Sequence, residues 1–300
     1  MSDFLESLSN AIGVTDSVFC LILTLASIIV AFVLGRIAVV KFPFENMAES
    51  GEGIGSFCNV LGVLYAIVLG YVLVNVYESY SMASEKVEAE ASLLIDLLRD
   101  AEGLPPIQGL ILRKATVNYM DSVIDEEWPY MIKNRDFHPE TFDKFSAIYK
   151  TVKQIKCDSD EQRLFLGEII ARLNDLSSTR RERIQVASSR VPDMLWVMLL
   201  GVGFVNFSMA FLFPVELPKL RIALLCSTAA VMTFTTLLIF ILDRPYNGTL
   251  GIKPDSLNKV REIIQTRGKP EQWDQDPRIQ SAIPKLEMLK KAVEKAKHSN

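Results

Sequence analysis

Hydrophobic positions along this chain gather in four long runs that contain no charged side chain. The runs are Ser17 to Gly35, Ile54 to Tyr77, Met194 to Phe213 and Ile222 to Leu242. A helix needs about 20 predominantly apolar residues to cross a hydrocarbon core of about 30 Å. The pattern therefore predicts four transmembrane helices.

After the second run, apolar residues become sparser but still recur three and four residues apart, from Ala83 to Leu98. This spacing predicts that the second spanning helix continues beyond the membrane until Gly103 and the prolines after it end it. Further helices are expected over residues 107–132, 140–156 and 160–190, and two more after Pro254. The expected fold is an all-α membrane protein with four transmembrane helices, whose helices extend into a cytoplasmic helical bundle.

These elements divide the chain into four segments. Residues 1–77 hold a short amphipathic lead-in and transmembrane helices 1 and 2, and residues 78–190 form the cytoplasmic helical region. Residues 191–243 hold transmembrane helices 3 and 4, and residues 244–300 form a cytoplasmic C-terminal turn and helices.

Basic residues near the ends of the runs indicate the orientation. One side of the membrane holds Lys86, Arg180, Arg181, Arg183, Arg190, Arg244, Lys253, Lys259 and Arg261, and the other side holds Arg36, Lys41, Lys219 and Arg221. Cytoplasmic loops carry an excess of Lys and Arg. We therefore expect a multi-pass protein of the cell (inner) membrane with both termini in the cytoplasm.

Composition narrows the function classes. A formal net charge of −4 argues against nucleic acid as the partner. The two histidines, His138 and His298, and the scattered cysteines show no metal-ligand spacing. No nucleophile triad or glycine-rich phosphate loop is present. The sequence predicts no catalytic residues, no metal and no cofactor, and so no enzyme.

The second run carries the most informative pattern. Gly62, Ala66 and Gly70 are spaced by four, which places them on one helix face where another backbone can approach closely. Asn59 and Asn75 carry amides that need a partner or water inside a membrane. This helix should therefore face protein or a pore, and the spacing alone leaves both possibilities open.

A short motif follows the fourth run. Asp243 and Arg244 leave the apolar segment, Pro245 breaks the helix, and Tyr246 is expected to anchor at the membrane interface. Asn247 and Gly248 complete the turn.

Three segments resemble a known family. They are LGVLYAIVLGYVLVNVYESYSMASEKVEAEASLLIDLLR, RRERIQVASSRVPDMLWVMLLG and LDRPYNGTLGIKPDSL. They are similar to the bestrophin-like bacterial membrane proteins, long catalogued as a domain of unknown function. The resemblance covers roughly residues 15–258.

A more distant similarity leads to the bestrophin anion channels. It implies pentamers around an axial pore, lined by the second span and narrowed by a hydrophobic neck. When Gly70 and Tyr71 are placed on that family's Gly-Phe pair, Val63, Ile67 and Tyr71 fall at the neck, with Asn59 above it. The turn from Arg244 to Gly248 resembles the family's turn after the last span. Animal members hold calcium in an acidic run after that turn, where this chain offers only Asp255.

The sequence and the resemblance lead to two alternative functions. The resemblance implies a homo-oligomeric ion channel in the lipid bilayer that conducts small anions. Its anion preference would come from helix ends and from arginines such as Arg180, Arg181, Arg183 and Arg190. Each arginine is also explained by positive-inside anchoring and by ion pairs with Glu182 and its neighbours.

The alternative is a non-conducting scaffold or sensor whose helical cytoplasmic region binds a partner. The two functions differ in whether the Val63 face of the second span lines a water-filled axis or packs against the other spans.

Overall fold

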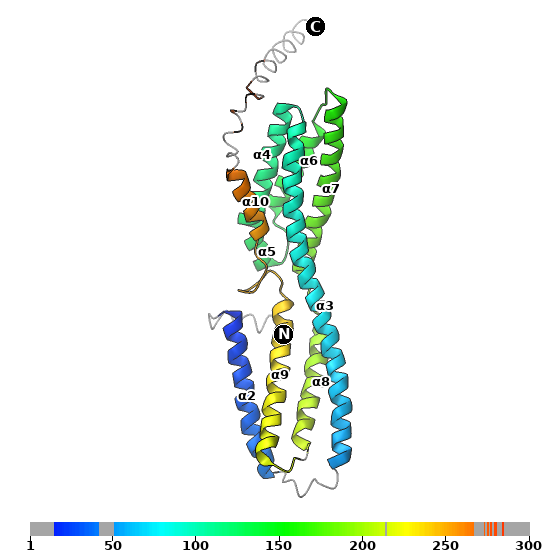
Figure 1. Cartoon of the computed structure of the whole chain (residues 1–300), viewed down its shortest axis with the longest axis vertical. Helices are drawn as coiled ribbons and strands as arrows, with labels where there is room; N and C mark the ends of the chain where they lie inside the picture. The colour runs from blue at the N-terminus through cyan, green and yellow to red at the C-terminus, as the bar shows by residue number, and fades with distance from the viewer. Residues whose placement is uncertain are drawn as a thin grey trace. The chain divides into compact units, whose positions relative to one another are not determined.

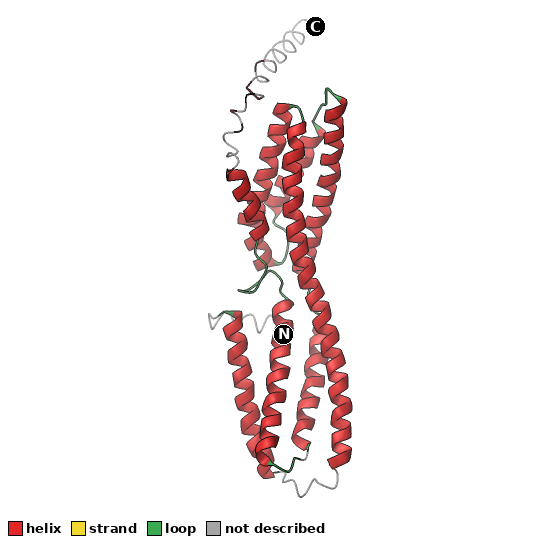
Figure 2. Cartoon of the chain, in the orientation of Figure 1, coloured by secondary structure: helices red, strands yellow, loops and turns green. Residues whose placement is uncertain are grey.

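The computed structural model describes residues 15–41, 51–213 and 215–266, together with isolated positions between 273 and 284. Every regular element in this part of the chain is helical (Figure 2). The chain divides into a membrane unit, Met1–Ser81 with Ser189–Ile252, and a bundle unit, Met82–Ser188 with Lys253–Asn300.

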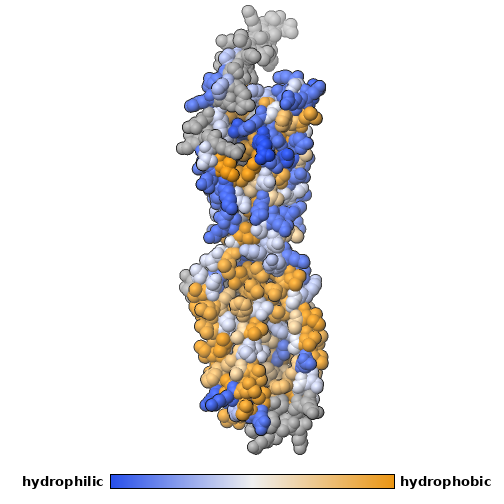
Figure 3. Space-filling view, in the orientation of Figure 1, coloured by the Kyte–Doolittle hydropathy of each residue, from blue (hydrophilic) through white to orange (hydrophobic). Residues whose placement is uncertain are grey.

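Four helices in the described residues are long and apolar enough to cross a membrane, which confirms the predicted spans. They are α2 (Asp16–Lys41), α3 (Gly51–Asp100), α8 (Asp193–Leu212) and α9 (Pro218–Leu242). In the membrane unit α2 packs along α9 (Figure 1). Hydrophobic residues dominate the surface that the membrane unit presents in Figure 3, as expected for helices surrounded by lipid.

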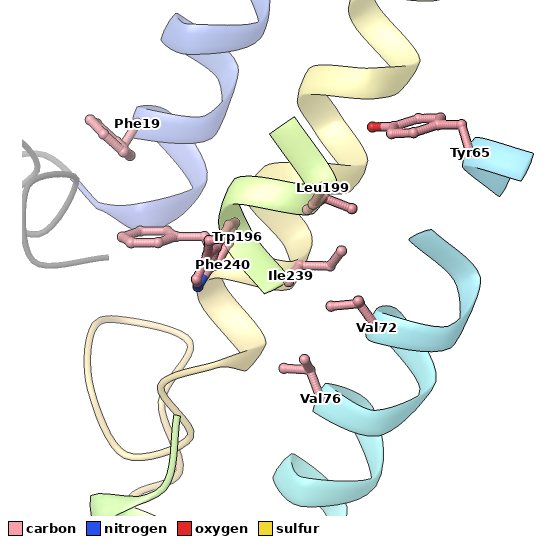
Figure 4. Close-up of a cluster of buried hydrophobic side chains, with 8 residues drawn as sticks. All are labelled: Phe19, Tyr65, Val72, Val76, Trp196, Leu199, Ile239 and Phe240. Carbon is pink, nitrogen blue, oxygen red and sulfur yellow. The ribbon is translucent and has the colours of Figure 1, made fainter. Parts of the chain in front are cut away.

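A cluster of buried side chains joins all four spans (Figure 4). Its members are Phe19 of α2, Tyr65, Val72 and Val76 of α3, Trp196 and Leu199 of α8, and Ile239 and Phe240 of α9. Between membrane helices lipid competes with protein for apolar contacts, so close van der Waals packing stabilises the association. The cluster therefore fixes which side of each span faces the other three.

The bundle unit contains the second half of α3 and a set of shorter helices. These are a 3₁₀ turn, η3 (Ala101–Gly103), α4 (Pro106–Ser122), a π-helical turn, η4 (Val123–Glu127), α5 (Trp128–Asn134), α6 (Pro139–Lys153), α7 (Asp160–Ser188) and α10 (Asp255–Thr266). The predicted end of the second spanning helix at Gly103 is confirmed.

The helix predicted over residues 107–132 is interrupted by the π turn, which a count of apolar spacing does not detect. The predicted lead-in over residues 1–16 and the last predicted helix, over residues 279–297, lie almost entirely outside the described residues.

Two buried acid–base pairs lie at the centre of the bundle unit. The side chains of Arg183, Glu90 and Glu127 are each 0% exposed. Arg183 donates from Nε to Glu90 Oε2 at 2.6 Å and from Nη2 to Glu127 Oε1 at 2.6 Å. Arg180 donates to the second oxygen of Glu127. Two guanidinium groups thus face two carboxylates, and the formal charges of the cluster cancel.

Neighbouring groups complete this ionic cluster. The Tyr119 hydroxyl donates to Glu90 Oε1 at 2.6 Å. Burial, reinforced by the charge of Glu90, raises the pKa of Tyr119 well above its usual value, so the hydroxyl remains a donor. Burial alone would lower the pKa of Arg183, but Glu90 and Glu127 outweigh it and raise that pKa well above its usual value. The Arg183 guanidinium therefore stays charged at the centre of the cluster.

Replacing Arg183 by Met should destabilise the protein strongly, because Glu90 and Glu127 would remain buried without their main partner. Breaking a buried pair from one side costs about 3–5 kcal/mol. Thermal unfolding of the detergent-solubilised protein, followed by tryptophan fluorescence, measures this cost. Arg181→Met is the matched control: Arg181 is exposed, and its loss should change stability by less than about 0.5 kcal/mol. Equal stability of the two variants would contradict the assignment.

Candidate pore-lining face of α3

Three of the exposed apolar side chains of α3 share one side of the helix; Phe57, Val60, Leu64, Val74 and Tyr77 are exposed as well. Val63, Ile67 and Tyr71, spaced by four, are 54%, 64% and 66% exposed. We call them the neck face. At about 100° per residue, Ile67 lies about 160° around the helix from Tyr65 and about 180° from Val76. Tyr65 and Val76 belong to the buried cluster. The neck face is therefore the side of α3 opposite the chain's own packing.

Tyr65 sets this orientation by a close approach to α8. A Cβ atom added at Gly203 would lie 3.2 to 3.4 Å from atoms of the Tyr65 ring. Because Gly203 has no side chain, the ring lies against the α8 backbone and fixes the rotation of α3 about its axis.

The small residues Gly62, Ala66 and Gly70 of α3 are not closely packed against another helix in the part of the chain that the structure describes. At Gly62 and Gly70 an added Cβ atom would meet nothing within 4 Å, and Ala66 is exposed. The close packing that their spacing favours is therefore not made by the helices that the structure describes. It would need a helix from another molecule.

The two amides of α3 differ in their surroundings. Asn59 is exposed one turn before Val63. Asn75 donates to the backbone carbonyl of Tyr71 at 2.7 Å, so its amide is satisfied by its own helix.

The turn after α9 is held by two carboxylates. Asp243 ends α9, is buried, and accepts a hydrogen bond from the Val191 amide at 2.7 Å, which ties the end of α9 to the chain entering α8. Asp16 accepts from the Thr249 amide at 2.6 Å and from its hydroxyl at 3.1 Å. The second contact could not be predicted from the sequence, because the partners are 233 residues apart.

Other residues of this turn shape the backbone. Arg244 stacks 4.3 Å from the centre of the Phe240 ring. The Pro245 carbonyl accepts from the Ile252 amide at 2.7 Å. Gly248 has a positive φ of 78° and its amide donates to the Asn247 side chain at 2.7 Å. Tyr246 is buried within the chain, whereas the sequence had suggested a ring at the membrane interface.

Two of the arginines expected to attract anions are not accessible. Arg180 and Arg183 are buried in the ionic cluster, and their partners are Glu90 and Glu127 rather than Glu182. Glu182 instead pairs with Lys86 at 2.5 Å. Arg190 lines a cavity of about 220 Å³ in the membrane unit beside Asn75 and Ser79.

Four membrane-spanning helices packed around a shared core define an all-α integral membrane protein. The sequence matches the Bestrophin-like domain over residues 26–257, so the chain belongs to the bestrophin-like family, as its motifs indicated. No curated protein sequence matches the chain.

Solved structures share the fold at low sequence identity. One variant of a bacterial bestrophin homologue from Klebsiella pneumoniae is 13% identical, with a TM-score of 0.64, and the match covers 82% of this chain and 99% of that one. A second variant is 15% identical, with a TM-score of 0.62, and the match covers 83% and 98% of the two chains. A structure described as a membrane protein is 14% identical, with a TM-score of 0.64, and the match covers 82% and 99%.

Replacing Gly203 by Leu should destabilise the membrane unit, because the new side chain would displace the Tyr65 ring from α8. Overpacking of this kind costs about 1–3 kcal/mol. Thermal stability in detergent measures the effect. Gly201→Leu is the control, since an added Cβ atom at Gly201 meets nothing within 4 Å. If both variants melted at the wild-type temperature, Tyr65 would not fix the position of α3.

Proposed function

We propose that the protein is a homo-oligomeric ion channel in which the neck faces of several copies surround a central pore. The observation that carries this proposal is the position of Val63, Ile67 and Tyr71. They lie on the side of α3 that the chain's own spans leave uncovered. A scaffold held together by packing of the second span would bury this side against the chain's other spans.

The residues that flank the neck face support a pore over lipid contact alone. Asn59 is exposed one turn before Val63, and Glu78 is exposed two turns after Tyr71. A face directed only at lipid would place an exposed amide at membrane depth, which is costly. An apolar ring between polar positions is the arrangement by which channels gate through dewetting. With a rise of 1.5 Å per residue, the neck would be about 12 Å long.

Assembly around an axis would also account for the small residues. Gly62, Ala66 and Gly70 lie beside the neck face and are not closely packed against any other helix in the described residues. In a closed ring, the α3 helix of a neighbouring copy can approach them closely. The family resemblance implies five copies.

We place the bundle unit and both termini in the cytoplasm, and the spans in the cell (inner) membrane. The basic residues near the span ends support this orientation.

The permeant species would be small ions, and the family resemblance implies anions. The buried arginines Arg180 and Arg183 do not support that preference, because carboxylates already neutralise them. The helix ends, the exposed Arg181 and Arg190 beside its cavity remain as sources of that preference.

Replacing Ile67 by Ala should widen the neck and raise ion flux several-fold, because an apolar constriction that excludes water becomes wider at its centre. Ion flux into liposomes that carry the purified protein measures this. Ile29→Ala is a matched control, since Ile29 of α2 is 63% exposed and Ile67 is 64% exposed. No flux from the wild type or from Ile67→Ala, with the protein folded and oligomeric, would favour the scaffold or sensor.

A membrane-impermeant maleimide should label Cys157 only after the cells are opened. Cys157 is partly exposed in the bundle unit, whereas Cys20, Cys58 and Cys226 lie in the spans. Cys157→Ser serves as the control for specific labelling. Labelling of Cys157 in intact cells would reverse the proposed orientation.

A further inference from the structure

The carboxylate of Glu78 lies on α3 in line with the neck face. Glu78 is the only residue with a charged side chain between Gly53 and Ser81, the part of α3 in the membrane unit whose side chains the structure describes. It follows Ile67 by eleven residues, so at about 100° per residue the two side chains differ by about 20° around the helix. It lies about 16 Å further along the axis than Ile67. Glu78 is therefore on the same side of α3 as the neck face.

The Glu78 carboxylate is exposed and makes no ion pair or hydrogen bond with any residue that the structure describes. Three acidic side chains further along α3 are paired: Glu90 lies in the ionic cluster, and Asp96 and Asp100 bind Arg172. Glu85 and Glu88, in the part of α3 that belongs to the bundle unit, are exposed like Glu78. The negative charge of Glu78 is thus not cancelled within its own chain.

Arg190 is a basic residue to be considered beside Glu78. Its cavity is lined by Val72 and Val76, which lie about 120° and 160° around α3 from Glu78, and also by Tyr71 and Asn75, which lie about 20° and 60° from it. The cavity therefore reaches the Glu78 side of α3, but Glu78 forms no ion pair with Arg190.

We propose that Glu78 determines the charge selectivity of the channel and makes it prefer monovalent cations. This rests on the proposed channel function. In a ring of identical subunits each copy contributes one Glu78, which gives a ring of carboxylates next to the neck. Rings of Asp or Glu select cations, because they raise the local concentration of cations and repel anions. The inference replaces the anion preference that the family resemblance implied.

The reversal potential under a tenfold KCl gradient across a planar bilayer gives the ratio of K⁺ to Cl⁻ permeability. Both the wild type and Ile67→Ala, whose wider neck gives larger currents, should favour K⁺. Glu78→Gln should lower the ratio by about fivefold or more, since a unit charge a few ångströms from an ion contributes about 1 kcal/mol even in water. Glu78→Arg should favour Cl⁻.

Two controls separate this role from a structural one. Glu161→Gln removes an exposed carboxylate from the first turn of α7 and should leave the ratio unchanged. Raising the salt to about 1 M shortens the screening length to about 3 Å, so the wild-type ratio should approach one while the Glu78→Gln ratio changes little.

Two results would overturn the inference alone: currents that prefer Cl⁻ in the wild type, or a ratio unaffected by Glu78→Gln. The absence of current from every variant, Ile67→Ala included, would instead overturn the proposed channel and this inference with it. The variant Arg190→Gln tests whether Arg190, and not Glu78, sets the charge selectivity. It should leave K⁺ preference intact, whereas a rise in that preference would assign the charge selectivity to Arg190.

Discussion

The contact between the Tyr65 ring and the α8 backbone at Gly203 determines much of the membrane unit. A ring that lies this close to a glycine backbone leaves α3 little freedom to rotate. Once that side of α3 is fixed, the periodicity of the helix fixes the opposite side. The apolar neck face, the exposed amide and the single carboxylate then all point away from the chain's own core. One close approach thus separates the surface for internal packing from the surface for a neighbouring molecule.

The bundle unit depends on a different kind of contact. Arg183 joins Glu90 of α3 and Glu127 of η4 in an interior from which water is excluded. A buried charge without its partner is costly, so these helices pack together only when both pairs form. The π turn η4 also links this buried cluster to helix α10 at the surface of the bundle unit. It places Asp125 where Arg261 of α10 donates to it at 2.6 Å, two residues before the buried Glu127. Internal packing and the docking of α10 therefore share one short segment.

The sequence predicted the spans well, because a run of about 20 apolar residues is a local signal. The neck residues could be proposed only by resemblance, since periodicity alone did not tell which side of α3 packs inside the chain. The partners of Arg183 could not be predicted, because Glu90 is 93 residues away and Glu182 is adjacent. Gly203 likewise looked like an ordinary glycine of a span, and only the position of Tyr65 explains it.

The hydrogen bonds between Asp16 and Thr249 join the beginning of the first span to the turn after the last. The chain between them, 233 residues along the sequence, therefore closes into a noncovalent circle. In such a circle the two ends of the span sequence are neighbours in space as well as partners in hydrogen bonding. The arrangement of the helices then depends on the cyclic order of the spans and not on which span comes first in the chain. The same arrangement of helices could be encoded by a sequence that begins at a different span.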